Sequence, residues 1–272
     1  MSAAPALRAA DVSTVDEARR FGGLTRLYGV EGAGRIRHAH VVVVGVGGVG
    51  SWTAEALARS GVARLTLIDL DHVAESNINR QVHALDATLG QAKVLAMRDR
   101  IAQIHPGCVV DAVEAFIEPD TLGGLLPSAA HAVIDACDNV AAKTAMAAWA
   151  RAHAACFISV GAAGGKRHAE KVDIADLALT THDPLLAQVR YRLRKHHGAP
   201  REGKPIGVAC VFSREAVAPP DASCEVQGQG DGALSCHGYG SVVGVTATFG
   251  MCAAGWVLER IAGSQKAPKT AL

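Results

Sequence analysis

The chain has 272 residues, of which 49% are hydrophobic, and its formal net charge is +1. A chain of this length can bury one large α/β core, and the composition is that of a folded protein. The nearly neutral charge excludes a global attraction to nucleic acid, so contact with RNA would need a local basic patch. The seven cysteines include no Cys-x-x-Cys pair, which argues against a four-thiolate zinc knuckle. The N-terminus lacks an apolar secretory segment, so we expect free thiols in the cytoplasm.

Residues 1–20 are predicted to form a frayed tail that leads into a short helix. The next segment, residues 21–29, clusters aromatic residues and glycines around Arg26. It is either an arm that docks elsewhere or an ordinary surface loop.

Four consecutive valines at 41–44 predict a strand that is buried on both faces of a parallel sheet. A glycine-rich turn and a predicted helix at 51–60 follow the strand. The start of a helix presents unpaired N–H groups, and glycines let a phosphate approach the backbone closely. The glycines of the turn are Gly45, Gly47, Gly48 and Gly50. By itself this turn indicates a nucleotide site and does not distinguish ATP from NAD.

The second predicted strand, residues 65–71, ends in Asp69 and Asp71. Asp69 lies 19 residues beyond Gly50, where such a fold places the acid that contacts a ribose. The alternative is that local backbone N–H groups hold this carboxylate at the end of the strand.

The polar segment at 75–83 contains Asn77 and Arg80, and a guanidinium can bind phosphate through two parallel hydrogen bonds. An amphipathic helix predicted up to residue 104 has Lys93 in its first turn. A cation is unfavourable at that end of a helix unless an anion is close. These residues favour a triphosphate ligand.

Strands and helices alternate from residue 41 to residue 160, which predicts a doubly wound, mostly parallel Rossmann-like sheet of the α/β class. The further strands are predicted at 108–113, 132–135 and 156–160, and the helices at 121–126 and 141–154. Asp138 follows one of these strands, on the side of an open α/β sheet where ligands bind. With phosphate oxygens it could hold Mg²⁺.

The pattern changes after residue 160, with strands predicted at 171–174 and 206–212 and a helix at 184–195. A run of cations in this region is either a solvated face or a contact for a polyanion. Its members are Arg190, Arg192, Arg194, Lys195, Arg201 and Lys204. Residues 218–232 are predicted to be a mobile loop, and Cys236 next to His237 is the thiol most expected to react.

Residues 234–258 contain no Asp, Glu, Lys or Arg and are long enough to span a bilayer. Their serines, threonines and glycines favour a buried segment that packs on the core or on a partner subunit. We expect no stable membrane insertion, and leave membrane contact as the alternative.

Five motifs occur in one order between residues 40 and 160: Gly-x-Gly-Gly-x-Gly, Asp69-Leu70-Asp71, Asn77-x-x-Arg80-Gln81, Gly90-Gln91-x-Lys93 and Asp135-x-x-Asp138-Asn139. Together they resemble the ThiF/MoeB-type adenylating enzymes, which are related to the ubiquitin-activating domain. The resemblance implies that Mg²⁺ and ATP bind and that a substrate carboxylate attacks the α-phosphate, which releases pyrophosphate.

The resemblance also implies roles for single residues. Asp69 and Asp71 would contact the ribose; Asn77, Arg80 and Lys93 the phosphates; and Asp138 the Mg²⁺. Arg26 would reach the ATP of the partner in a homodimer. The implied organisation is an N-terminal arm and helix at 1–40, an ATP-binding domain at 41–160, and a smaller α+β region for substrate and dimer contacts at 161–272.

Within this superfamily the chain resembles the dehydratases that act on threonylcarbamoyladenosine in tRNA. The matching segments are 20–29, 79–85, 183–185, 207–213 and 245–250. This resemblance implies ATP-dependent closure of the threonylcarbamoyl group on the adenosine 3′ of the anticodon. The basic run would then track tRNA phosphates. Cys236, beside His237 and after the mobile loop, either receives the acyl group as a thioester or is a buried spectator cysteine. The sequence leaves two questions open: whether sulfur-transfer partners such as a cysteine desulfurase bind, and whether backbone carbonyls hold an alkali ion.

Three other functions compete. An activator of a ubiquitin-like sulfur-carrier protein shares the first step, but the missing zinc motifs and the basic run argue against it. An NAD-dependent oxidoreductase leaves Arg80, Lys93 and Asp138 without a role. A non-catalytic scaffold is disfavoured because the chain has the full set of polar residues that the resemblance assigns to ATP.

Overall fold

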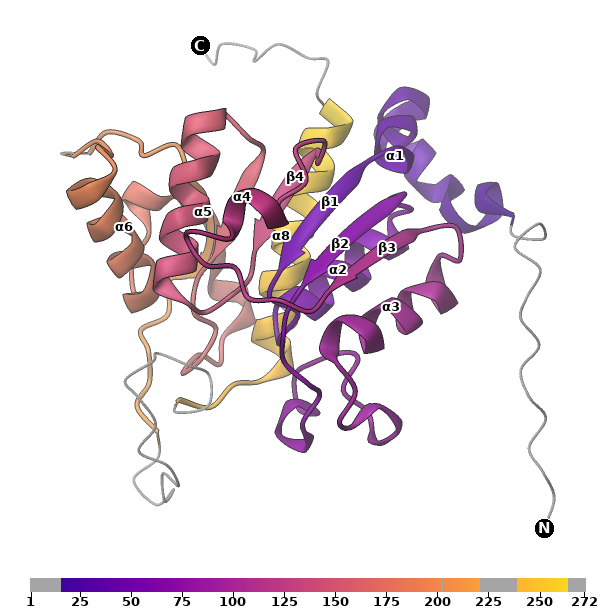
Figure 1. Cartoon of the computed structure of the whole chain (residues 1–272), viewed down its shortest axis with the longest axis horizontal. Coiled ribbons are helices and arrows are strands. Elements are labelled where there is room, and N and C mark those ends of the chain that lie inside the picture. Colours follow the sequence, from indigo (N-terminus) through magenta and orange to yellow (C-terminus); the bar gives the residue numbers. More distant parts are fainter. Residues whose placement is uncertain (1–15, 202, 221–238, 264–272) are drawn as a thin grey trace.

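The computed structural model describes residues 16–201, 203–220 and 239–263. The predicted α/β fold is confirmed: seven strands form one sheet in the order β3-β2-β1-β4-β5-β7-β6 (Figure 1). All neighbouring strands are parallel except β6 and β7. The strands are β1 (His40–Val44), β2 (Arg64–Ile68), β3 (Val109–Val113), β4 (Ala132–Asp135), β5 (Phe157–Val160), β6 (Val172–Asp176) and β7 (Ala209–Ser213).

The four valines of β1 are buried, as their sequence predicts. Val41 and Val43 pack into one hydrophobic cluster, and Val42 and Val44 pack into another on the opposite face. The first cluster is covered by α1 (Glu17–Arg37), α2 (Gly50–Arg59), α3 (Lys93–Ile104) and α8 (Val243–Gly263). The second is covered by α4 (Leu122–Leu125), α5 (Val140–His153) and α6 (Pro184–His196). The sheet therefore has helices on both faces.

The N-terminal segment differs from the predicted loop. Residues 21–29 lie inside α1, which is interrupted at Gly29 (φ 73°, ψ 169°). The ring of Phe21 is buried and meets the ring of His105 edge-on, with 4.7 Å between their centroids. The first part of the helix is thus held on its own subunit by an aromatic contact that sequence spacing does not reveal.

The strand predicted at 206–212 begins three residues later, at Ala209. The backbone N–H groups of Ile206 and Gly207 donate to the two carboxylate oxygens of Asp176, at 2.8 and 2.7 Å. Because those groups are bonded to a side chain, they cannot join the sheet.

The uncharged stretch at 234–258 is described from residue 239 onward, and there α8 buries one face while residues such as Val242 and Met251 are exposed. There α8 crosses behind the sheet and packs on α2, with Phe249, Ala253 and Val257 fully buried (Figure 1). The predicted packing on the core is confirmed, and among the described residues no helix is long and apolar enough to cross a membrane. Residues 234–238 lie outside the described ranges.

Close approach of α8 to α2 depends on Gly250. A Cβ at this position would lie 2.6 Å from the carbonyl oxygen of Val49 and 3.0 Å from Cβ of Trp52. We expect Gly250→Ala to lower the free energy of unfolding by about 1–3 kcal/mol, measured by urea denaturation. Gly255, on the same helix, has open space beside it, so Gly255→Ala should raise stability by about 0.5–1 kcal/mol. Equal effects of the two substitutions would contradict tight packing at Gly250.

Candidate functional site

A cavity of about 370 Å³ opens at the carboxyl edge of the sheet, beyond the ends of β1, β2 and β4. The predicted residues that line it are Gly45, Gly47, Gly48, Asp69, Asp71, Arg80, Lys93 and Asp138. We call it the nucleotide cavity. Larger hollows of about 890 and 750 Å³ lie elsewhere in the described part of the chain, and none of these eight residues lines either of them. Chemistry rather than size therefore identifies the site.

The glycine turn can adopt its shape only without side chains. Gly45 has φ +83°, and a Cβ there would lie 2.8 Å from the backbone nitrogen of Cys137. A Cβ on Gly50 would lie 1.7 Å from the carbonyl oxygen of Gly45. Gly50 does not line the cavity; it closes the turn and begins α2, whose first turn has no side-chain cap. The start of α2 thus offers backbone N–H groups of the kind that bind phosphate.

The two acids after β2 have different surroundings. Asp69 is buried and accepts the N–H groups of Val46 (2.6 Å) and Asp71 (2.9 Å), so the local backbone contact considered for it does occur. Burial raises the pKa of Asp69. Asp71 has a half-exposed side chain, and its carboxylate lies 2.7 Å from Nζ of Lys93. Lys93 is buried at the first residue of α3, as predicted, so Asp71 balances its charge in this structure.

Arg80 is a buried cation in the nucleotide cavity that has no partner charge among the described residues. Its side chain is buried, and its Nη1 donates to the carbonyl oxygen of Ser76 (2.7 Å) and to Oδ1 of Asn79 (2.9 Å). It runs along Gly48, where a Cβ would lie 3.3 Å from its Cγ. Within the described ranges it forms no ion pair. An uncompensated buried charge is costly, so this position favours an anion in the cavity.

Asn77 does not reach the cavity. It is buried, and its Oδ1 accepts the N–H of Ala74 at 3.0 Å, so it shapes the turn that carries Arg80. Phosphate accepts hydrogen bonds, so only the Nδ2 group of Asn77 could contact it directly, and Asn77 does not line the cavity.

Asp138 is exposed at the rim, and the next residue, Asn139, caps α5 by accepting two backbone N–H groups. Among the described residues no group of three or more His, Cys, Asp or Glu side chains could hold a metal by itself. Mg²⁺ bound with a nucleotide needs only one or two carboxylates, because phosphates and waters supply the other oxygens. The carboxylate of Asp138, in a cavity with a phosphate-binding turn, fits such an ion.

Sequence reasoning missed several lining residues. Residues 115–118 follow β3, and residues 161–163 follow β5. Both segments leave the sheet at its carboxyl edge, and that position alone could have identified them. Leu185 of α6 and Thr246 of α8 also line the cavity; both lie in segments that match the family, but their position at the site was not predicted.

The structure divides the basic run. Nη1 of Arg190 donates to the carbonyl oxygens of Leu177 and Thr180, and Nε of Arg194 donates to that of Pro200. These two arginines hold their own region together, which a sequence cannot reveal. Lys195, Arg201 and Lys204 are exposed, and Arg192 is partly exposed.

Two predicted residues lie away from the nucleotide cavity or outside the description. Arg26 is exposed on α1 and does not line the cavity of its own chain. Cys236, and all of the predicted mobile loop beyond residue 220, lie outside the described residues.

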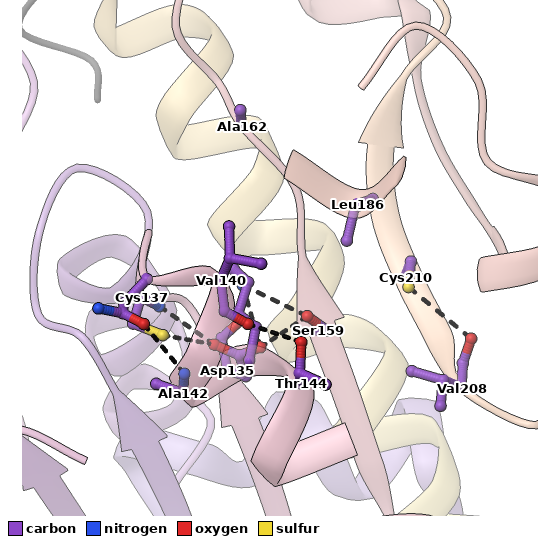
Figure 2. Close-up of polar contacts among 12 residues, drawn as sticks. Asp135, Cys137, Val140, Ala142, Thr144, Ser159, Ala162, Leu186, Val208 and Cys210 are labelled. Atoms are coloured by element: carbon purple, nitrogen blue, oxygen red, sulfur yellow. Dashed lines mark hydrogen bonds and ion pairs between the residues drawn. The ribbon is translucent and has the colours of Figure 1, made fainter. Parts of the chain in front are cut away.

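Behind the cavity lies a buried polar network that the sequence did not predict. Figure 2 shows Asp135, the last residue of β4, with Ser159 of β5 and Cys137 directed towards it. Nζ of Lys143, on α5, lies 3.0 Å from Oδ2 of Asp135, and both side chains are fully buried. Ser159 donates to the same oxygen at 2.6 Å. Burial is the largest single influence on the pKa of Lys143 and lowers it, but the charge and hydrogen bond of Asp135, together with the nearby thiols of Cys137 and Cys210, leave the pKa above its ordinary value.

His83 is buried beside the phosphate-binding segment, and neither ring nitrogen has a hydrogen-bond partner among the described residues. Burial, together with the charges of Lys93 and Arg100, lowers its pKa from 6.5 to about 4. Unfolding exposes the ring, so below pH 6.5 the unfolded chain binds a proton that the folded chain does not.

We therefore expect His83 to reduce stability by up to about 3 kcal/mol as the pH falls from 6.5 towards 4. Urea denaturation at several pH values should show that His83→Gln weakens this dependence relative to the unchanged protein. Two parallel stability profiles would mean that the ring is hydrated or paired when folded.

A phosphate-binding turn, an unpaired buried guanidinium and carboxylates at the carboxyl edge of a doubly wound sheet define a nucleotide-binding α/β protein. The family follows from comparison: the model of the ThiF family matches residues 22–272, and the chain belongs to that family.

Named relatives are more specific. The chain is similar to the tRNA threonylcarbamoyladenosine dehydratase of Escherichia coli, with 41% identity over 250 residues that cover 89% of this chain and 93% of the relative. The crystal structure of E. coli tRNA N6-threonylcarbamoyladenosine dehydratase, TcdA, in complex with ATP matches with a TM-score of 0.82 and 40% identity, covering 92% of this chain and 97% of that one. The molybdopterin-synthase adenylyltransferase of Salmonella typhimurium is 30% identical over 236 residues, covering 76% of this chain and 94% of the relative.

Proposed function

We propose that this protein is an ATP-dependent, ligase-type dehydratase that cyclises threonylcarbamoyladenosine in tRNA. The observation that carries the proposal is the buried guanidinium of Arg80, which has no partner charge within the described ranges and lies beside a glycine turn of the kind that binds phosphate. Similarity along nearly the whole chain to a dehydratase crystallised with ATP supports the same reaction.

The chemistry requires activation because a carboxylate has no good leaving group. The substrate carboxylate attacks the α-phosphorus of ATP, and the bond to the β-phosphate breaks with release of pyrophosphate. A nitrogen or oxygen of the same substituent then attacks the acyl carbon and loses its proton. It displaces AMP directly, or, if a cysteine thiol has first displaced AMP to form a thioester, it displaces that thiolate. Charge builds on the phosphates during the first step, and fixed cations stabilise it. The net change is the loss of one water from the nucleoside.

We assign the fixed cations to Arg80 and Lys93, both of which line the cavity. Arg80 would bind phosphate oxygens. Lys93 would either leave Asp71 to bind the phosphates or contact them while it stays paired with Asp71. Asp69 and Asp71 would face the ribose, and Asp138 would hold Mg²⁺, which when bound neutralises phosphate charge. Arg26 would act on the nucleotide of a partner subunit in a homodimer.

We propose that tRNA lies along the exposed cations of the basic run: Arg192, Lys195, Arg201 and Lys204. Arg190 and Arg194 are bonded to their own backbone, which makes them weaker candidates. A thioester on Cys236 is proposed as the acyl carrier; cyclisation at an unchanged rate in Cys236→Ala would mean that the adenylate is attacked directly.

The test is incubation with bulk tRNA that carries the modification, with and without ATP, followed by mass analysis of the nucleosides. We expect the mass of one water to be lost only when ATP is present. tRNA without the modification should give no AMP.

The second candidate is an activator of a ubiquitin-like sulfur-carrier protein, which similarity to a molybdopterin-synthase adenylyltransferase favours. Release of AMP with such a carrier, and no change in the tRNA, would select this candidate over the dehydratase.

A further inference from the structure

Lys143 and Asp135 form an ion pair that is sealed from water, one layer behind the nucleotide cavity. Nζ of Lys143 donates to Oδ2 of Asp135 (3.0 Å), to the carbonyl oxygen of Asp135 (3.3 Å) and to Oγ of Ser159 (3.3 Å). Lys143 comes from α5, Asp135 from β4 and Ser159 from β5. The pair therefore joins one helix to two adjacent strands at their carboxyl ends.

The other oxygen of Asp135 controls the next turn of the chain. Oδ1 accepts the backbone N–H of Cys137 at 3.3 Å and its thiol at 3.1 Å (Figure 2). The turn at 136–139 continues into Asp138, which lines the cavity, and into the cap of α5. It also lies against the glycine turn, since a Cβ on Gly45 would meet Cys137 and Ala136 at 2.8–2.9 Å. A shift of Asp135 would therefore move both turns.

A buried ion pair is weak support for stability alone, because the cost of removing two charges from water can exceed their attraction. Here each oxygen of the carboxylate is engaged, one by Lys143 and Ser159 and the other by the turn. Such a network selects one arrangement of the segment it holds.

We propose that Lys143 is a positioning residue: through Asp135 it holds the 136–139 turn so that the carboxylate of Asp138 meets the Mg²⁺ that accompanies ATP. The inference rests on the proposed function, because it takes Mg²⁺ and ATP as the occupants of the cavity. Lys143 itself does not line the cavity, so it would contact neither Mg²⁺ nor ATP.

The measurement is the affinity for ATP by titration calorimetry, with Mg²⁺ and with Mg²⁺ removed by chelation, in the full-length protein without tRNA. The ratio of the two affinities is the gain from Mg²⁺. We expect Asp138→Ala to remove most of this gain and Lys143→Met to reduce it by about tenfold, as for other residues that orient a metal ligand. Ser159→Ala removes one hydrogen bond from the same carboxylate and should reduce the gain in the same direction. Ser159→Ala takes the place of Lys143→Met in this measurement if Lys143→Met does not fold.

A double-mutant cycle separates positioning from a general loss of stability. If Lys143 acts through Asp138, the Asp138→Ala/Lys143→Met protein should lose no more of the gain than Asp138→Ala alone. The matched control is Glu55→Gln: Glu55 is a buried carboxylate paired with Arg59 and Arg100, and it does not line the cavity. In Glu55→Gln the gain in ATP affinity from Mg²⁺ should match that of the unchanged protein.

A full gain from Mg²⁺ in folded Lys143→Met or Ser159→Ala would overturn the inference while leaving the proposed function intact. An equal loss in Glu55→Gln would also overturn it, because the effect would then follow stability rather than position. If the unchanged protein binds no ATP, the proposed function fails together with the inference. If it binds ATP equally with and without Mg²⁺, the inference alone is overturned.

Discussion

Arg80→Ala should abolish the release of AMP and pyrophosphate, with a fall in kcat/KM on the order of 10²–10³-fold or more. The guanidinium is buried at the glycine turn, and no described residue supplies a partner charge, so its electrostatic effect on an anion is little screened by water. Arg80→Lys keeps the charge but loses the planar pair of donors, so we expect activity between that of alanine and arginine. The measurement is AMP release with modified tRNA, after circular dichroism has shown that each protein is folded.

Arg151→Ala is the matched control for Arg80→Ala. The Arg151 side chain also donates to backbone carbonyls, those of Ile206 (2.9 Å) and His197 (3.2 Å), and it does not line the cavity. It should lower stability and leave AMP release nearly unchanged. Near-normal turnover in Arg80→Ala would remove Arg80 from the site.

The second large effect is on stability. Lys143→Met leaves Asp135 as an isolated charge in a fully buried site, and such a change typically costs about 3–5 kcal/mol. We expect a comparable loss for Asp135→Leu, which strands the lysine. Urea denaturation of the two single variants and of Asp135→Leu/Lys143→Met measures the effect.

The double variant should be more stable than the sum of the single losses implies, because neither charge is then left alone. A single variant that loses less than about 1 kcal/mol would mean that water reaches the pair. The contribution of the pair to the free energy of unfolding and its effect on Mg²⁺ binding are measured separately, so either prediction can be correct without the other.

Boundaries of elements were the least predictable part of the fold. The strands at β1 and β4 agree closely with their predicted ranges because runs of apolar residues mark them. β7 begins late because a carboxylate from a residue 30 positions earlier captures the preceding N–H groups. Residues 21–29, expected to be a docking arm or a surface loop, are helical, and the contact of Phe21 with His105 joins positions that are distant in the sequence.

The α/β class, the glycine turn and most of the polar residues around the cavity were predictable from the order of residues alone. These signals are local: a strand, a turn and a helix follow one another, and the carboxyl ends of parallel strands meet at one edge. The positions of Asp69, Arg80, Lys93 and Asp138 follow from that rule.

Only the tertiary structure decided which polar residues face the cavity and which support it. Asn77 turns into its own loop, Arg190 binds its own backbone, and Lys143 lies behind the cavity rather than in it. Each outcome depends on which elements lie side by side, as when α5, β4 and β5 bring Lys143, Asp135 and Ser159 together. Spacing along a chain does not encode such contacts, because burial and pairing arise from residues that are distant in the sequence.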